Sequence, residues 1–425
     1  MSGAVYWRLG AQANTFADPP SLPASADFAI VGAGITGTSA ALSLAERGAS
    51  PLLLERGEPG DGASGLNAGV AVPCWPGLSP GLVEQICGAD RGRRFNRMLI
   101  EAPSVLDEWA ATHGLVGIES RVGVTYAAHD AASARALRRL YEEWHERGAR
   151  VDWHEPDVMR SRYGAEALDV GITYRDSRVL NPFLLTRSLA SAAALRGAQL
   201  HCRTDVRSIE ADGAGWRLHT SRGTVRAGHV LIATDSFKSN LIPGLDALSF
   251  VLPYSIVVTR ADADVTNQFA QPLCDTFAAQ ALFVYRGSEG RLFGSLPPTM
   301  MVPASAAALG RKFERRLRRV FPDAVVADWE YAWVGPVACS ASGLPTLTPF
   351  GSGLHALGGY SGFGLLPAIQ WGRAYAAAAL DPSGDPLREL ESPPVTAPYG
   401  KFKTLLLRVA MSAAARFADR SYRRR

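Results

Sequence analysis

The first regular pattern of apolar residues begins directly after Asp27. Four consecutive apolar residues, 28–31, end at Gly32 and predict a short buried strand. Apolar residues then recur at helical spacing, and a second apolar run, 51–54, ends at Glu55. A strand, a glycine turn, a helix and a second strand form a βαβ unit of about thirty residues.

The rest of the chain divides into helical and β-like segments. Apolar residues at helical spacing predict further helices over 82–112, 131–148, 183–197, 304–321 and 365–380. Short β-forming runs predict strands within 200–206, 216–220, 224–226, 230–233, 250–259, 282–296, 329–338 and 354–357. The glycine-rich segment 57–80 is predicted to be weakly structured, and the five prolines of residues 381–400 predict a linker.

The composition is that of an ordinary globular protein. The chain has 425 residues, of which 47% are hydrophobic and 20% charged, which excludes a disordered chain and predicts two or three domains. No run approaches the ~18 apolar residues of a membrane-spanning helix, and residues 1–23 lack the pattern of a signal peptide. Five scattered cysteines without CxxC spacing predict free thiols and no metal site. We therefore expect a cytoplasmic protein.

The net charge of +4 arises from one end of the chain. Residues 401–425 hold eight basic residues against one acidic residue, so the other 400 residues sum to −3. The helix predicted over 304–321 is rich in arginine, but its apolar residues repeat on one face, which favours a solvated outer face of a packed helix. We expect no nucleic-acid partner. The basic amphipathic tail, 401–425, leaves two alternatives open: weak contact with a membrane surface, or docking on the body or on a second subunit.

The turn of the βαβ unit carries the sequence GAGITG, which fits the GxGxxG pattern of dinucleotide-binding proteins. Gly32 permits the tight turn, Gly34 lets the backbone approach a pyrophosphate, and Gly37 lets the helix pack closely on the strand. The helix N-terminus stabilises the phosphate charge. Glu55, eighteen residues beyond Gly37, is spaced to bind an adenosine ribose. A purely structural glycine turn is the alternative, and the flanking elements favour the dinucleotide site.

The segment after Glu55 helps to distinguish an FAD site from an NAD site. A simple NAD domain continues directly into a helix and a strand, whereas here Arg56 is followed by the small-residue sequence GDGASGLNAG at 60–69. Such a backbone can follow an extended cofactor towards a flavin ring. A flexible surface loop is the alternative interpretation of these residues alone.

Further blocks follow in a recognisable order along almost the whole chain. They are IVGAGITG with LLLE, GASGLNAG, DSRVLNPFLL, VLIATDSF, GRLFGS and LGGYSGFG. With these blocks the sequence resembles the D-amino-acid-oxidase-like family of FAD-dependent oxidoreductases, which includes glycine oxidase, sarcosine oxidase and γ-glutamylputrescine oxidase. Tyr6-Trp7 and the basic tail resemble the γ-glutamylputrescine-oxidase-like branch.

The resemblance implies a set of FAD-binding residues in this chain. They are Gly32, Gly34, Ile35, Thr36 and Gly37 at the pyrophosphate, Glu55 and Arg56 at the adenosine, Ser64, Asn67, Ala68, Gly69 and Val70 towards the ring, Val206 at the adenine, Ala233 and Thr234 at a strand end, and Gly359, Gly362, Phe363, Gly364 and Leu365 near the flavin.

The chain also departs from the family's pattern at several positions. Asp235 stands where a glycine is usual, Ser342 where an acid is frequent, and Phe363 where many members have histidine. No histidine or cysteine occupies a position that bonds the flavin covalently, so we expect non-covalent FAD.

Catalytic side chains are harder to name, because the flavin performs the redox step in such enzymes. The resemblance places Tyr254, Arg291, Trp333 and Tyr360 on the substrate side, with Tyr285 and Arg286 as further candidates. Each of them also suits a packing role.

The resemblance implies an α/β fold in which two domains interleave. A Rossmann-like FAD-binding domain would use 25–80, 150–240 and 340–380, and an antiparallel-sheet α+β substrate domain would use 81–149 and 241–339. The expected reaction is oxidation of a C–N bond of a small-molecule amine, with O₂ reoxidising the flavin to give H₂O₂. The alternatives are a dehydrogenase that passes electrons to a quinone or carrier protein, and a flavin-binding protein without this activity.

The substrate prediction rests on an absent cation. Amino-acid oxidases of this family hold the substrate carboxylate with an arginine shortly before the final strand, whereas residues 333–343 here contain no cation. This predicts an amine without a free α-carboxylate beside the oxidised nitrogen, unless Arg286 or Arg291 supplies the charge from another strand.

Overall fold

The structure is a computed structural model. It describes residues 4–9, 16–17, 21–164, 168–237, 241–261, 271–276, 283–296, 305–324, 328–381, 383, 385–392, 405–406 and 409–410. The predicted tail, 401–425, lies almost wholly outside the described residues, and so does the second half of the predicted linker.

One of the two halves of the molecule in space is built on a mainly parallel sheet. Its strands β9 (Gln199–His201), β2 (Leu52–Leu54), β1 (Ser25–Val31), β12 (Gly223–Ile232) and β19 (Leu354–Gly358) lie in this order and run in one direction. An antiparallel meander, β10 (Val206–Asp212) and β11 (Gly215–Thr220), joins the first half of β12, and β18 (Thr346–Gly351) pairs antiparallel with β19. Strands β1 and β2 are apolar on both sides because both faces of this sheet are covered.

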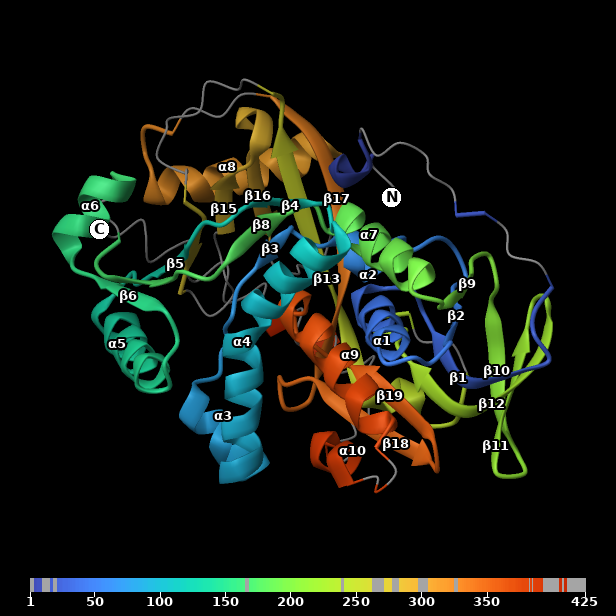
Figure 1. Ribbon diagram of the computed structural model, residues 1–425. Helices are drawn as coiled ribbons and strands as arrows, with labels where there is room; N and C mark the ends of the chain where they lie inside the picture. Colours follow the sequence, from blue (N-terminus) through green and yellow to red (C-terminus); the bar gives the residue numbers. More distant parts are fainter. Residues whose placement is uncertain are drawn as a thin grey trace.

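Three helices cover one face of this sheet. Helix α1 (Ile35–Glu46) packs between α7 (Pro182–Leu195) and α9 (Leu365–Ala379), as Figure 1 shows. Helix α7 begins where the sequence predicts, because the Asn181 side chain accepts the N–H of Leu184 and Pro182 occupies the first turn. Helix α4 (Ala89–His113) packs on the outer side of α9, with α3 (Pro80–Cys87) and α10 (Asp385–Leu390) beside them.

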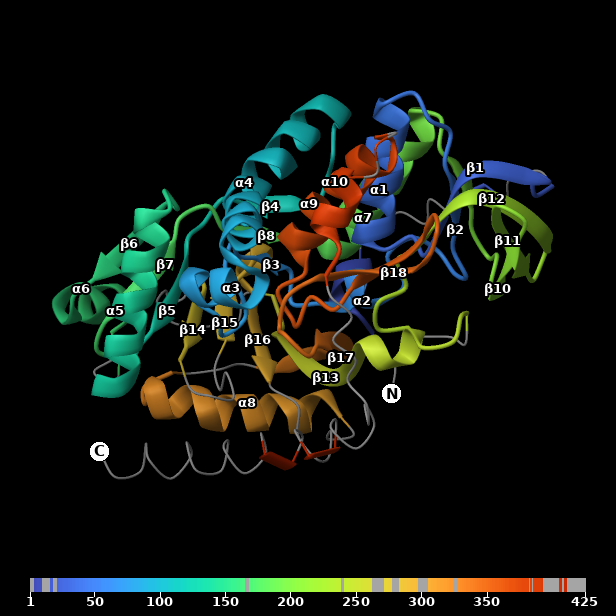
Figure 2. The same cartoon turned by 90° about the horizontal axis from the view of Figure 1, so that it is seen from below.

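A second, mostly antiparallel sheet forms the other half. Its order is β17 (Trp329–Ser340), β13 (Ser249–Thr259), β16 (Leu292–Leu296), β15 (Phe283–Arg286), β14 (Leu273–Asp275), β5 (Val124–Ala127), β7 (Gly171–Tyr174) and β6 (Val151–His154). Helix α8 (Ala306–Val320) lies across β13, β16 and β17 (Figure 2), and its residues Leu309, Phe313 and Leu317 are buried there. Arg311 and Arg315 of the same helix are exposed, as expected of a solvated outer face. Helices α5 (Ala131–Glu146) and α6 (Pro156–Tyr163) flank β6 and β7.

Short elements connect the two sheets. A three-stranded sheet orders β3 (Val70–Ala71), β8 (Arg178–Leu180) and β4 (Ile118–Ser120), and the one-turn helix α2 (Ala63–Leu66) precedes it. The 3₁₀ turn η1 (Tyr6–Arg8) lies beside α7, while η2 (Leu245–Leu248) and η4 (Ser288–Gly290) connect strands. An isolated bridge between Cys339 and Tyr360 joins the end of β17 to the segment after β19.

The predicted α/β class is confirmed, and several boundaries differ from the sequence prediction. The helix expected over 82–112 is two helices, since Gly88 adopts φ 84° between α3 and α4. Strands β6 and β7, from the range 150–240 assigned to the FAD-binding domain, pair in the second sheet. Residues 385–390 of the predicted linker form α10, because Leu390 finds an apolar site and is buried.

Candidate functional site

An elongated cavity of about 450 Å³ follows the carboxyl edge of the parallel sheet. Its lining comes from segments within 204–206, 54–70, 31–36, 233–237 and 360–368, which follow β9, β2, β1, β12 and β19, and from 336–338 of β17. The carboxyl ends of parallel strands are where ligands bind in open α/β sheets. The cavity therefore spans five neighbouring strands of one sheet and is covered by a strand of the other.

The glycine turn after β1 forms the middle of this cavity. Gly32 adopts φ 104°, and a Cβ there would lie 2.9 Å from the carbonyl oxygen of Ala233. A Cβ on Gly34 would lie 2.8 Å from the Ser64 Oγ, which accepts the N–H of Ile35 at 2.9 Å. A Cβ on Gly37 would lie only 1.9 Å from the Gly32 carbonyl oxygen, so this glycine is required for the helix to pack on the strand.

Glu55 ends β2 and holds the turn from the neighbouring strand. Its Oε2 accepts the N–H of Ala33 at 2.7 Å, and its Oε1 accepts the N–H of Gly57 at 2.8 Å. Burial raises the pKa of Glu55, and the two backbone N–H donors oppose this shift. The Arg56 guanidinium lies 5.7 Å from the ring centroid of Phe237, and both residues line the same end of the cavity.

The opposite end of the cavity lies between β17 and the start of α9. Pro336, Val337 and Ala338 of β17 face Gly362, Gly364 and Leu365 across it, with Ala68 and Val70 also in the lining. Helix α9 begins at Leu365, so its positive N-terminus is part of this wall. The Tyr360 hydroxyl lies 2.8 Å from the Thr36 Oγ1, and burial raises the pKa of Tyr360, which keeps the phenol protonated.

Asp235 lies at the end of β12 in an unusual backbone conformation. Its φ is 43°, a left-handed value that L-residues other than Asn and Asp rarely adopt. Its Oδ1 accepts the N–H of Gly359 at 2.7 Å, and a Cβ on Gly358 would lie 2.5 Å from the same oxygen. This carboxylate therefore ties the end of β12 to the glycine segment that leads into α9.

Comparisons with known proteins agree with this arrangement. A family model described as FAD dependent oxidoreductase (DAO) matches residues 27–378. The chain belongs to this family of FAD-dependent oxidoreductases. Among the curated relatives, the probable oxidoreductase OrdL of Rhizobium meliloti is 28% identical over 408 residues, which are 92% of each chain.

Two further relatives have named activities. Glycine oxidase of Geobacillus kaustophilus is 31% identical over 357 residues, 80% of this chain and 89% of that protein. Gamma-glutamylputrescine oxidoreductase of Escherichia coli is 23% identical over 386 residues, 86% and 87% of the two chains. The crystal structure of the glycine oxidase shares the fold with a TM-score of 0.66 at 24% identity, over 82% of this chain and 93% of that chain.

The residues of the cavity fit FAD, the cofactor of this family. Its lining includes Glu55, the glycine turn at the N-terminus of α1, and the glycine segment at Gly362. Gly34 and Ser64 both line the cavity and lie close together, because a Cβ on Gly34 would be only 2.8 Å from the Ser64 Oγ. No histidine or cysteine is among the described residues that line the cavity.

The structure brings most of the predicted cofactor residues together, and their individual roles stay predictions. All of them line the cavity except Gly37, Gly69, Gly359 and Phe363. Gly37 and Gly69 are packed against neighbouring backbone, Gly359 donates to Asp235, and Phe363 packs on the main core.

The four predicted catalytic residues are placed differently from one another. Tyr360 lines the cavity. Tyr254 packs beside Val337 and Cys339, and the Trp333 indole donates to the Leu66 carbonyl oxygen at 3.0 Å, so neither is part of the described lining. Arg291 lies away from the cavity, where its guanidinium bonds the carboxylates of Glu289 and Glu330.

Sequence reasoning missed the residues that reach the cavity only through tertiary structure. These are Thr204, Asp205, Asp235, Phe237, Ala368 and the β17 segment 336–338, whereas the small residues at 60–63 belong to the segment that the sequence predicts to follow the cofactor. A signal was present for some of them: Asp235 interrupts an apolar strand end, and Gly335-Pro336 interrupts the apolar pattern of a long strand.

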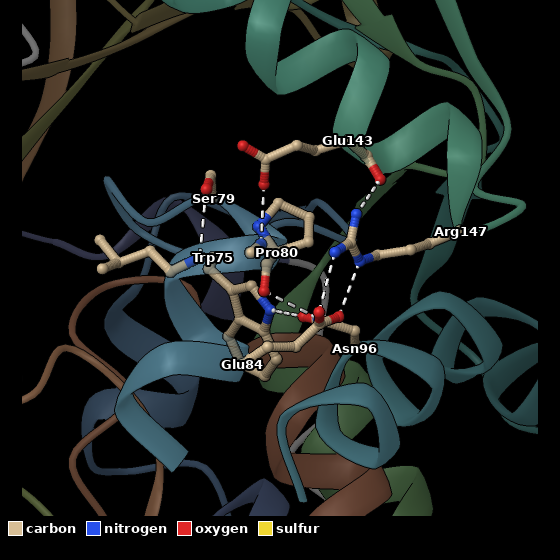
Figure 3. Close-up of polar contacts among 9 residues, drawn as sticks. Trp75, Ser79, Pro80, Glu84, Asn96, Glu143 and Arg147 are labelled. Atoms are coloured by element: carbon tan, nitrogen blue, oxygen red, sulfur yellow. Dashed lines mark hydrogen bonds and ion pairs between the residues drawn. The ribbon is translucent and has the colours of Figure 1, made fainter. Parts of the chain in front are cut away.

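A polar network fixes the chain that follows Val70, one of the residues that line the cavity. The Trp75 indole donates to the Asn96 Oδ1 at 2.7 Å, and Asn96 donates to the Glu84 Oε1 at 3.0 Å. Arg147 of α5 reaches the same carboxylate with two nitrogens, at 2.8 and 2.9 Å (Figure 3). Trp75 also meets Trp371 of α9 edge to face at 5.9 Å. The network thereby links α3, α4 and the C-terminal end of α5 behind α9, the helix that begins at the cavity.

The described part of the chain lacks the features of a metal site and of a membrane-spanning helix. It contains no cluster of three or more histidine, cysteine, aspartate or glutamate side chains suited to a metal ion. Within the same residues, no helix combines the length and apolar character needed to cross a bilayer.

Proposed function

We propose that this protein is an FAD-dependent oxidase of an amine that has no free α-carboxylate beside the oxidised nitrogen. Membership of the family establishes an FAD-dependent oxidoreductase, and its relatives include enzymes named for an amino acid and for a polyamine derivative. The proposal concerns the substrate class and the electron acceptor.

The charge of the cavity carries the proposal. Among the described lining residues, the single cation is Arg56, which lies at the Glu55 end and not at the β17 end. Of the two predicted alternatives, Arg291 is held by Glu289 and Glu330, and Arg286 is not among the described lining residues. A substrate carboxylate beside Val337 and Leu365 would be buried without a charged partner, and this burial would weaken its binding by about 2–5 kcal/mol.

The residues at this end suit a neutral amine. When bound, FAD would accept the hydride from the C–H bond beside the amine nitrogen; loss of the N–H proton would leave an imine that water hydrolyses to a carbonyl compound and ammonia or an amine, and O₂ would reoxidise the reduced FAD and be converted to H₂O₂. The apolar wall of Val337, Ala338 and Leu365 disfavours an ammonium group, so the amine would lose its proton on entry. The N-terminus of α9 stabilises negative charge that develops next to Gly364.

The decisive experiment compares substrates on the purified flavoprotein. Stopped-flow reduction of the flavin is measured with γ-glutamylputrescine, putrescine and monoalkyl amines against glycine, sarcosine and D-alanine. We expect reduction by one or more of the amines that lack a neighbouring carboxylate to be at least tenfold faster at equal concentration. Faster reduction by the amino acids would place the enzyme on the glycine-oxidase side of the family.

Electron flow is measured in the same preparation. Turnover with the best amine should release H₂O₂ stoichiometrically with O₂ uptake and should need no NADH or NADPH, since one dinucleotide fingerprint is present in the sequence. Amine-dependent reduction of a quinone without peroxide would show a dehydrogenase instead. Failure of all amines and amino acids to reduce the flavin would overturn the proposal.

A further inference from the structure

Three aromatic side chains hold consecutive carbonyl groups of the loop that passes the cavity. The Trp333 indole donates to the Leu66 carbonyl oxygen at 3.0 Å, and the Trp7 indole donates to that of Asn67 at 2.8 Å. The Tyr285 hydroxyl donates to the carbonyl oxygen of Ala68 at 2.8 Å. These donors come from β17, the N-terminal turn η1 and β15, which are far apart in the sequence.

The loop therefore has one orientation relative to the cavity. Its carbonyl groups are bonded on the side of the second sheet, while Asn67 and Ala68 line the cavity. Gly69 continues the loop with φ 73°, and a Cβ there would lie 2.7 Å from the Trp7 ring and 2.5 Å from the Leu180 carbonyl oxygen. The backbone at Gly69 therefore lies in close contact with the Trp7 ring and the Leu180 carbonyl group, while the three hydrogen bonds set the orientation of the loop.

Trp7 is held in place by burial, a hydrogen bond and aromatic stacking. Its side chain is fully buried, and its carbonyl oxygen accepts the Asn181 Nδ2 at 3.0 Å. Its ring stacks on Phe293 at a centroid distance of 5.0 Å, and Phe293 stacks on Tyr285 at 4.8 Å. Two of the three carbonyl donors thus belong to one aromatic stack.

We propose that Trp7 is a positioning residue of the flavin site. The N-terminal turn docks against both halves of the molecule and, through the indole N–H, sets the backbone of residues 67–69 beside the isoalloxazine ring. The inference deepens the proposed function and rests on its flavin site, but it does not depend on which substrate is oxidised. Loss of this single bond removes the indole donor from a partly buried carbonyl group and lets the loop tilt, which changes the surroundings of the ring.

The test uses a conservative variant with a matched control. Trp7→Phe keeps an aromatic ring in the stack and removes the donor, whereas Trp216→Phe removes an indole bond to the Ser352 carbonyl oxygen, 2.9 Å long, in the distant β10–β12 meander. Four quantities are compared for the FAD-loaded proteins: the Kd of FAD, the visible circular dichroism of the flavin, the Kd of sulfite as a flavin-directed probe, and hydrogen exchange of the amides at 66–70.

We expect Trp7→Phe to weaken FAD binding about fivefold to tenfold, the effect of one hydrogen bond. The visible circular dichroism and the Kd of sulfite should change with it, and exchange at 66–70 should speed up, while Trp216→Phe leaves all four unchanged. Tyr285→Phe, which removes only the hydroxyl bonded to Ala68, should shift the same quantities in the same direction and carries the test if Trp7→Phe fails to fold.

A change in stability without a change at the flavin would contradict the inference. If Trp7→Phe and Tyr285→Phe lower the melting temperature but leave the flavin circular dichroism, the Kd of sulfite and loop exchange at wild-type values, Trp7 is a packing residue and the inference is wrong. Failure of the proposed function shows separately, as a wild-type flavoprotein that no amine reduces.

Discussion

Substitutions at Asp235 can distinguish two contributions to the free energy of unfolding: the strain of its left-handed backbone and its hydrogen bond with Gly359. The residue combines φ 43° with a 2.7 Å bond from the Gly359 N–H to its carboxylate. A hydrogen bond to a charged group contributes about 1.5–3 kcal/mol, and a left-handed conformation costs an ordinary L-residue about 1–2 kcal/mol. Three variants therefore have different predicted stabilities.

Asp235→Ala loses the bond and keeps a side chain that tolerates this φ poorly, so its free energy of unfolding should fall by about 2–4 kcal/mol. Asp235→Gly also loses the bond but relieves the strain, and its loss should be about 1 kcal/mol smaller. Asp235→Asn keeps an acceptor oxygen and tolerates the left-handed region, so it should lose only about 1 kcal/mol.

The assay is urea unfolding of the FAD-saturated proteins at one pH, followed in parallel by intrinsic and flavin fluorescence. The order of midpoints should be wild type, Asn, Gly, Ala. An alanine variant as stable as the glycine variant would refute the strain argument. An asparagine variant as unstable as the alanine variant would show that charge, not the bond to Gly359, is what matters at this position.

Three more predictions follow from single contacts. Gly37→Ala places a Cβ 1.9 Å from the Gly32 carbonyl oxygen, so the purified variant should be colourless and about 3 kcal/mol less stable, measured as flavin content and urea midpoint. Arg147→Met leaves the Glu84 carboxylate without its two-nitrogen partner and should cost about 1.5–3 kcal/mol; adding Glu84→Gln should restore part of this loss, and no restoration would refute the pairing. Burial lowers the pKa of His154 from 6.5, so the unfolded chain takes up its proton first and stability should decline as pH falls below about 6.5; His154→Gln should flatten that decline in urea midpoints measured against pH.

The sequence was most informative where the chemistry is local. The glycine turn at 32–37 and Glu55 could be predicted because the strand, turn and helix that give them meaning are neighbours along the chain. The assignment of FAD needed the longer small-residue segment and the order of the blocks. The small-residue segment and the order of the blocks are both visible in the sequence without any knowledge of how the strands pair.

Residues that act through tertiary contacts escaped this reasoning. Pro336 and Val337 reach the cavity only because β17 pairs with β13 over its length and crosses the end of the parallel sheet. The resemblance assigns Arg291 to the substrate side, but its partner Glu330 lies 39 residues later in β17, and only the pairing of the strands brings the two side chains together. Trp7 was noticed only as part of a resemblance, since nothing local connects it with a loop sixty residues away.

The order in which the chain supplies the carboxyl edge bears on how the protein is made in the cell. Strand β1 is the third of five parallel strands in space, yet its neighbour β12 ends at Ile232 and the outer strand β19 ends at Gly358. A ribosome has therefore translated more than four-fifths of the 425 residues before the last strand and the start of α9 emerge. Strand β2 gains its outer partner when β9 emerges and β1 gains its partner when β12 emerges, whereas the far edge of β12 stays open until β19 emerges, which exposes that edge to aggregation and to chaperones. The lining of the cavity is therefore complete only after residues 360–368 have emerged, so we expect FAD to bind late in the synthesis of the chain.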